Sequence, residues 1–209
     1  MKQIDPRKIK CVVFDFGSTL SSDPYFKISP PECPNWHAVI QEFIFGDKVL
    51  VKQWMSGSLK IFDIASIIAT KVGLPVPIIV DMMEKGCENL VFNEVVWKFA
   101  LSQRDQGRKT ALVTANMDVF TKVVVPSHAL SQVFDVILNT SDYKELRKEI
   151  LWPVAFEMLG EGIHYDNSLL IEDGPKEPAL FRAQGGYAYQ YHNDEQLAQW
   201  LRSAGFNSL

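Results

Sequence analysis

The sequence contains no run of about 20 apolar residues, the length that a helix needs to cross a bilayer. Its longest apolar stretch, at residues 78–83, is interrupted by Asp81. The first ten residues, MKQIDPRKIK, lack the apolar segment of a secretory signal peptide. We therefore expect neither a membrane-spanning segment nor a membrane partner.

Positive charge and cysteine are also scarce. The chain has 21 Lys and Arg against 25 Asp and Glu, a formal net charge of -4, and no basic stripe, so nucleic-acid binding is not expected. The three cysteines, Cys11, Cys33 and Cys87, have neither metal-ligand spacing nor the pattern of a disulfide framework. Reduced thiols are typical of the cytoplasm, which is the predicted location.

Apolar residues, by contrast, are plentiful: 47% of the 209 residues are hydrophobic. This is enough to form the core of one globular domain, or of a core domain with a smaller insert. Residues 21–35 contain four prolines, which forbid a regular element, and are expected to form a linker or a loop beside the site. Residues 36–106 then show helical spacing without an intervening strand.

In this helical region, Ser58 is the expected N-cap of a helix that Gly73 ends. The helices are expected from residue 36 onward and at residues 59–72, 77–89 and 93–106. Consecutive helices form a small bundle. We therefore predict a helical cap domain at residues 22–96, inserted into a core domain of residues 1–21 and 97–209.

Short apolar runs mark the rest of the chain and alternate with helical segments. The predicted strands are residues 10–16, 110–114, 135–139, 168–171 and 187–191. The predicted helices among them are residues 149–159, a helix ending near 183, and residues 195–204. This alternation is typical of βαβ crossovers. The predicted fold class is α/β, a three-layer Rossmann-like core with a parallel sheet covered on both faces.

Polar residues follow three of the apolar runs: Asp15 after VVF, Thr114 after ALV, and Glu172 with Asp173 after LLI. Parallel strands bring their carboxyl ends, where ligands bind in open α/β sheets, to one edge. Clustered acids repel one another unless a cation or a proton neutralises them. Mg²⁺ prefers carboxylate and carbonyl oxygens. We therefore expect Asp15 and Asp173 to share one Mg²⁺, which requires them to lie within ~10 Å of each other.

These runs resemble the four motifs of the haloacid dehalogenase (HAD) superfamily of hydrolases, most of which are phosphatases. FDFGSTL, at residues 14–20, is similar to the first motif, and ALVTAN, at residues 111–116, to the second. RKE, at residues 147–149, is similar to the third, and IEDGPKE, at residues 171–177, to the fourth. The four occur in the family's order, and the helical insert lies where helical-cap members of the family carry their cap.

The resemblance implies a mechanism in which Asp15 attacks phosphorus and forms an aspartyl-phosphate that water later cleaves. The residues that it implies are the Mg²⁺ ligands Asp15, Gly17 (through its carbonyl) and Asp173; the cation Lys148; the substrate-binding residues Ser18, Thr114, Ala115 and Asn116; and Glu172 and Glu177, which would orient metal-bound water or Lys148. Lys144 and Arg147 compete with Lys148 for the cationic role. The implied partner is a small phosphorylated substrate.

Gly17 departs from the family pattern, because most phosphatases of this family have an Asp at that position to protonate the leaving group. General acid–base catalysis is typically worth about 10²–10⁴-fold. Three interpretations stay open. Asp23 or His37 supplies the proton, the leaving group needs none, as in acyl or aryl phosphates, or the protein keeps the fold without most of the activity.

Three functions are therefore compared. The leading hypothesis is a Mg²⁺-dependent phosphoric monoester hydrolase acting on a small metabolite. A metal-independent dehalogenase is disfavoured, because the acids at 172, 173 and 177 would then lack a counterion. A non-catalytic binding or regulatory protein is favoured by Gly17. The sequence predicts neither the individual substrate nor the oligomeric state.

Overall fold

A parallel β-sheet forms the centre of the protein, which is described here by a computed structural model covering residues 4–206. Its strands are β1 (Cys11–Phe14), β2 (Lys109–Thr114), β3 (Val136–Asn139), β4 (Ser168–Glu172) and β5 (Tyr187–Gln190). Their order is β3-β2-β1-β4-β5, and every pairing is parallel. The predicted α/β class is confirmed, and all five strands lie within a residue or two of the predicted positions.

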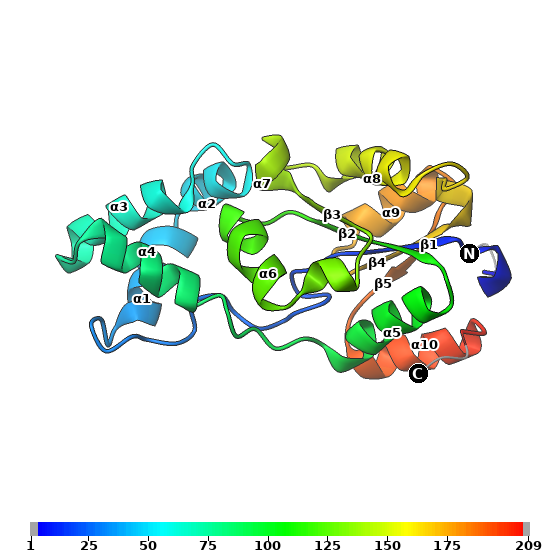
Figure 1. Cartoon of the computed structure of the whole chain (residues 1–209), viewed down its shortest axis with the longest axis horizontal. Helices are drawn as coiled ribbons and strands as arrows, with labels where there is room; N and C mark the ends of the chain where they lie inside the picture. Colours follow the sequence, from blue (N-terminus) through cyan, green and yellow to red (C-terminus); the bar gives the residue numbers. More distant parts are fainter. Residues whose placement is uncertain (1–3, 207–209) are drawn as a thin grey trace.

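Helices cover both faces of the sheet (Figure 1). On one face lie α8 (Leu151–Leu159) and α9 (Lys176–Ala183). On the other lie α5 (Glu94–Asp105) and α10 (Asp194–Ser203), which also pack against each other. Two short helices, α6 (Val125–Ser127) and α7 (Thr140–Tyr143), flank β3 in the chain. The core is therefore the predicted three-layer arrangement.

The two faces are separated by the alternation of side chains along each strand. Val13 of β1 belongs to the buried cluster that includes Trp152 and Phe181, on the side of α8 and α9. Phe14 belongs to the other cluster and packs edge-on against Phe99 of α5, at 6.0 Å between ring centroids. The strands are apolar throughout because both of their faces are covered.

Four further helices lie between β1 and β2 in the chain and together at one end of the molecule, beyond the sheet (Figure 1). They are α1 (Trp36–Ile40), which a π-helix (Gln41–Phe45) continues, α2 (Lys48–Met55), α3 (Ile61–Val72) and α4 (Val76–Lys85). We call them the cap helices. They support the HAD-like fold with a helical cap, whereas the division at residues 22 and 96 stays a prediction.

Local details of the cap helices differ from the expectations. The helix α2 was not predicted from the sequence. The prediction of Ser58 as an N-cap was wrong, because α3 begins at Ile61 with Lys60 as the N-cap and Asp63 accepts the Lys60 N–H at 2.8 Å. Gly73 does end α3, in the left-handed conformation with φ of 73° that glycine adopts without strain.

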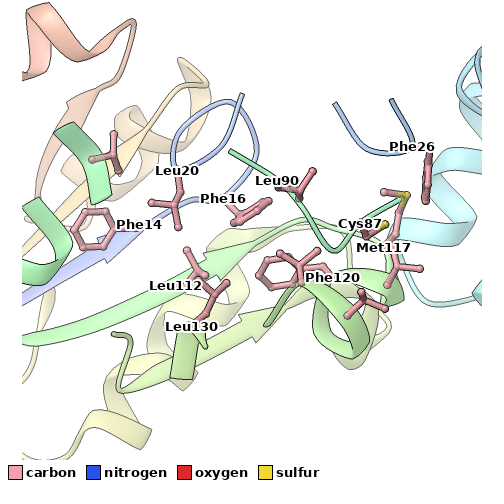
Figure 2. Close-up of a cluster of buried hydrophobic side chains, with 14 of the residues drawn as sticks. Phe14, Phe16, Leu20, Phe26, Cys87, Leu90, Leu112, Met117, Phe120 and Leu130 are labelled. Carbon is pink, nitrogen blue, oxygen red and sulfur yellow. The ribbon is translucent and has the colours of Figure 1, made fainter. Parts of the chain in front are cut away.

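One buried apolar cluster joins the sheet to the cap helices (Figure 2). Phe14 and Leu112 extend from β1 and β2, Phe16 and Phe120 lie at the carboxyl edge, and Phe26 lies beside the cap helices. Phe26 stacks on Trp54 of α2, with 6.1 Å between ring centroids and 7° between ring planes. The proline-rich segment 21–35 has no helix or strand, as predicted, but Phe26 anchors it.

Within residues 4–206, no single helix is long and apolar enough to cross a membrane. Together, α3 and α4 would be long and apolar enough to do so, but the two helices are bent by 113° relative to each other.

Candidate active site

Asp15 lies immediately after β1, the central strand of the sheet. Its backbone N–H continues the strand pairing by donating to the Ile171 carbonyl of β4 at 3.1 Å. The register sets Phe14 beside Leu112 on one side and beside Ile171 on the other. Asp15 therefore emerges between the ends of β2 and β4, and its side chain is buried, with 5% of the residue exposed.

Three acids meet at this edge. Asp15, Glu172 and Asp173 each offer a carboxylate oxygen, and these oxygens lie within 4.8 Å of one another. Asp15 Oδ1 is buried and has no hydrogen-bond partner among the described residues. A buried, unpartnered carboxylate oxygen is costly unless something binds it. The donor set is all oxygen, as Mg²⁺ prefers, and therefore fits such an ion.

The turn after Asp15 brings a hydroxyl to Asp173. The N–H groups of Leu20 and Ser21 both donate to the Phe16 carbonyl, at 2.9 Å each, and close the turn. Thr19 Oγ1 donates to Asp173 Oδ1 at 3.1 Å and accepts the Asp173 N–H at 3.0 Å. These two bonds join the first and fourth motifs, and the sequence analysis gave Thr19 no role.

Unlike Thr19, neither Ser18 nor Gly17, the two predicted site residues in this turn, makes a side-chain hydrogen bond to the acids within residues 4–206. Ser18 is exposed, with φ of 56°, and its N–H donates to the Ser21 carbonyl at 2.8 Å. Gly17 is half-buried, and a Cβ added there would meet nothing within 4 Å. The substrate-binding role of Ser18 and the metal-ligand role of the Gly17 carbonyl stay predictions.

Lys148 is the cation that reaches the acids. It lies in a 3₁₀ turn (Lys148–Ile150) before α8, and its Nζ is 3.1 Å from Asp15 Oδ2 and 2.5 Å from Glu172 Oε2. The competing cations are elsewhere. Arg147 is exposed and pairs with Glu145 at 3.0 Å, whereas Lys144 is exposed at the end of α7. Of these three cations, Lys148 is the one that contacts the acids, and its role as the phosphate-neutralising cation stays a prediction.

The buried charges shift one another's pKa values. Burial and the neighbouring charge of Asp15 raise the pKa of Glu172 from 4.5 to about 8, although Lys148 opposes this. Burial alone would lower the pKa of Lys148, but Asp15 and Glu172 together raise it above its ordinary value. Lys148 is therefore a fixed positive charge, and the cluster of acids carries more negative charge than one lysine neutralises.

The second motif forms the neighbouring wall. Thr114 ends β2, and its Oγ1 is buried without a partner in the described part of the chain. The loop that follows is held by Asn139 at the end of β3, whose Oδ1 accepts the Asn116 N–H at 3.0 Å and whose Nδ2 donates to the Met117 carbonyl at 2.9 Å. Ala115 lies between them, half-buried. The role of Asn139 in supporting this loop was not predicted from the sequence.

Glu177 lies in the first turn of α9, with its Oε2 over Gly174: a Cβ at Gly174 would lie 2.8 Å from it and 3.5 Å from Glu172 Oε1. The absence of a side chain at Gly174 therefore leaves room for the carboxylates of Glu177 and Glu172 beside the loop that carries Asp173. The orienting roles predicted for Glu172 and Glu177 stay predictions, although Glu172 contacts Lys148 directly.

Neither of the proton donors considered from the sequence is free at the site. Asp23 pairs with Lys27 and accepts the Val91 N–H at 2.9 Å, and these bonds hold its pKa below the ordinary value despite partial burial. His37 is exposed on α1, and no hydrogen bond or ion pair within residues 4–206 joins it to the site.

Asp118 is a buried acid that the sequence analysis did not single out. Its Oδ1 accepts the Trp54 Nε1–H of α2 at 2.7 Å and the Ile61 N–H of α3 at 3.1 Å. Its Oδ2 lies 3.5 Å from Lys122 Nζ. Since Asp118 follows Asn116 by two residues, the loop after β2 is tied directly to the cap helices.

A parallel sheet covered by helices, acids at the ends of β1 and β4 and a buried lysine beside them define an α/β protein with a charged site at the carboxyl edge of its sheet. Neither a protein-family model nor a curated protein matches this sequence. Solved structures do match it. One is a HAD family enzyme from Bacteroides thetaiotaomicron in complex with magnesium and inorganic phosphate: 16% identity, TM-score 0.64, covering 93% of this chain and 100% of that one.

Two further structures have the same fold. A predicted HAD-like family hydrolase from Porphyromonas gingivalis is 16% identical, with a TM-score of 0.66 over 93% of this chain and 98% of that one. The L-2-haloacid dehalogenase from Xanthobacter autotrophicus, with chloropropionic acid covalently bound, is 16% identical, with a TM-score of 0.57 over 94% and 84%. At these identities the likeness establishes the fold: this chain has the HAD fold, as its motifs indicated.

Proposed function

We propose that the protein is a Mg²⁺-dependent phosphohydrolase of the HAD superfamily that forms an aspartyl-phosphate on Asp15. The observation that carries the proposal is the meeting of Asp15, Glu172 and Asp173 within 4.8 Å, with one oxygen of Asp15 unpartnered and Lys148 beside the other. A nucleophile must attack a dianionic phosphate, so positive charge beside it is required.

Asp15 and Asp173, with the Gly17 carbonyl, would hold the magnesium ion, which supplies charge neutralisation between the carboxylates and the phosphate. Thr19 holds Asp173 in place through its two hydrogen bonds. Lys148, which pairs with Asp15, adds positive charge for the oxygens of the transferring phosphoryl group. Thr114 Oγ1, buried and unpartnered, is a hydroxyl donor for a phosphate oxygen.

The comparisons support this proposal without deciding between phosphatase and dehalogenase activity. One structural neighbour is a complex with magnesium and inorganic phosphate, and another is a dehalogenase. The cluster of acids around Asp15 favours the phosphatase. A carbon-attacking Asp needs no cation, whereas three acids crowded around one lysine favour a site that a cation completes.

The decisive experiment measures two products with the same purified protein. Phosphate release is assayed from p-nitrophenyl phosphate, acetyl phosphate and a panel of sugar, glycerol and nucleoside monophosphates, with MgCl₂ and with EDTA. Chloride release is assayed from L-2-chloropropionate. We expect phosphate release that EDTA abolishes and no chloride release. EDTA-resistant chloride release would establish the dehalogenase, and the absence of both products would favour a binding protein.

A further inference from the structure

Gly17 leaves the proposed reaction without the side chain that most HAD phosphatases use as the proton donor. The hydroxyl of Tyr25 contacts Asn116, in the loop that follows Thr114. We propose that Tyr25 is a catalytic residue, whose phenolic O–H protonates the oxygen that leaves when Asp15 attacks phosphorus. The inference rests on the proposed phosphohydrolase function.

The hydrogen bonds of Asn116 determine which way the Tyr25 hydroxyl donates. Asn116 Oδ1 accepts the Met117 N–H at 2.9 Å, so the amide group presents Nδ2 to Tyr25. Asn116 Nδ2 then donates to Tyr25 Oη at 2.9 Å. With a lone pair already occupied, the phenol has its own hydrogen left to donate, and no acceptor within residues 4–206 takes it. The hydrogen is therefore available to a substrate.

Tyr25 is positioned by contacts toward the sheet edge and toward the cap helices. Its ring contacts Phe16, directly after Asp15, at 6.4 Å between centroids, and Phe26, which stacks on Trp54 of α2, at 5.9 Å. Its hydroxyl contacts the loop of the second motif, two residues after Thr114. A leaving group that extends from the phosphate toward the cap helices would pass this hydroxyl.

Burial raises the pKa of Tyr25 well above 10, so the phenol carries its proton at neutral pH. An alkoxide is a much stronger base than a phenolate, so proton transfer to it is downhill. An aryl-oxide leaving group such as p-nitrophenolate is stable without a proton. The effect of Tyr25 must therefore depend on the leaving group.

The proposed proton transfers balance. In the first step an Asp15 oxygen bonds to phosphorus, the ester P–O bond breaks, and its electron pair takes the Tyr25 proton, giving alcohol and phenolate. In the second step a water oxygen bonds to phosphorus and its proton returns to the phenolate. The P–O bond to Asp15 breaks, and carboxylate and hydrogen phosphate form.

Tyr25→Phe tests the proposal because it removes the hydroxyl and keeps the ring packing. Turnover of glycerol phosphate and sugar phosphates should fall by about 10- to 100-fold, below the full range for general acid catalysis because the pKa is so high. Turnover of p-nitrophenyl phosphate should change by less than about 3-fold, because its leaving group needs no proton. The thermal midpoint should fall by only a few degrees, because Asn116 Nδ2 loses its acceptor, and the variant should stay folded at the assay temperature.

Tyr165→Phe is the matched control. Tyr165 lies on the opposite face of the sheet, packed against Trp152, Phe156 and Phe181. It should leave both activities unchanged. Gly17→Asp is the rescue, since a Cβ at Gly17 meets nothing within 4 Å and its φ is not in the positive range. It should restore alkyl phosphate turnover in the Tyr25→Phe background and raise it less in the wild type.

Each other outcome overturns the inference. Equal losses for alkyl and aryl phosphates would make Tyr25 a structural residue, and no loss for either would remove it from the reaction; in both cases the phosphohydrolase proposal survives. If the wild type neither releases phosphate from any of these substrates nor becomes phosphorylated on Asp15 by acetyl phosphate, the proposed function fails and this inference fails with it.

Discussion

Asp15 and Asp118 are both buried aspartates near the carboxyl edge of the sheet, and their surroundings are opposite. Every contact of Asp118 is attractive: it accepts N–H groups from Trp54 and Ile61 and pairs with Lys122. Asp15 lies among acids, shares Lys148 with Glu172, and keeps one oxygen without a partner in the described structure. Both are buried: 5% of Asp15 and 3% of Asp118 is exposed.

The difference distinguishes two uses of a buried charge. A buried carboxylate whose hydrogen bonds are all made within the protein stabilises the folded state. One that is crowded by like charges and incompletely bonded is a cost to stability, which a ligand can offset. By this criterion Asp118 holds the cap helices to the core, whereas the Asp15 cluster has the surroundings expected of the proposed site for a cation and a substrate.

Asn substitutions at the two aspartates should separate activity from stability. Asp15→Asn should lower phosphate release from p-nitrophenyl phosphate by at least about 10³-fold, because the amide is not a nucleophile. Its thermal midpoint should equal or exceed that of the wild type, since one repelling charge is removed. Retained turnover would remove Asp15 as the nucleophile, and a large loss of stability would contradict the comparison.

Asp118→Ala should show the opposite behaviour. It leaves the Trp54 and Ile61 N–H groups without their acceptor, and we expect a loss of about 2–4 kcal/mol in the free energy of unfolding. Urea denaturation followed by tryptophan fluorescence measures it. Asp166→Ala is the control: Asp166 is exposed, and the substitution should stay within about 0.5 kcal/mol. An equally small effect at Asp118 would mean that the cap helices are held by apolar packing alone.

Magnesium should stabilise the protein through the Asp15 cluster. A saturating excess of MgCl₂ should add about 1–3 kcal/mol to the free energy of unfolding, since it binds the folded state alone. Asp173→Asn should remove most of this gain, whereas Asp166→Asn should keep it. Isothermal titration with Mg²⁺ gives the same answer independently of stability. A gain that persists in Asp173→Asn would place the ion elsewhere.

Glu172 should make the stability of the metal-free protein fall as the pH rises. Its pKa is raised from 4.5 to about 8 in the folded state, mainly by burial and then by Asp15, so the folded state binds the extra proton between these values. The stability this contributes is complete below pH 4.5 and is lost as the pH rises through about 8.

Glu172→Gln isolates this small effect. The thermal midpoint of the variant, relative to that of the wild type, should be higher near pH 8 than near pH 4.5. Added Mg²⁺ should reduce the difference, because the ion neutralises the ionised acids. A pH-independent difference would show that Glu172 does not titrate in this range.

The fold and the position of the site were predictable because both follow from local patterns. Continuous apolar runs predict buried parallel strands, and a polar residue at the end of each run predicts an edge where ligands bind. Asp15, Thr114, Glu172 and Asp173 were found in this way. The helix α2 was missed, and Ser58 was assigned as an N-cap that the chain forms at Lys60 instead. The second error concerns where a helix begins, and helix ends are the least certain part of any assignment.

What the sequence by itself determined is the order of strands and helices and the residues at the strand ends, because apolar periodicity and chain order carry that information. Only the tertiary structure decided which cation of 144–148 enters the acid cluster and which side chains bond across it. Thr19 and Asp173 are 154 residues apart, Tyr25 and Asn116 are 91 apart, and Trp54 and Asp118 are 64 apart. Such pairs produce no periodic pattern in the sequence, because folding alone brings their atoms within hydrogen-bond distance.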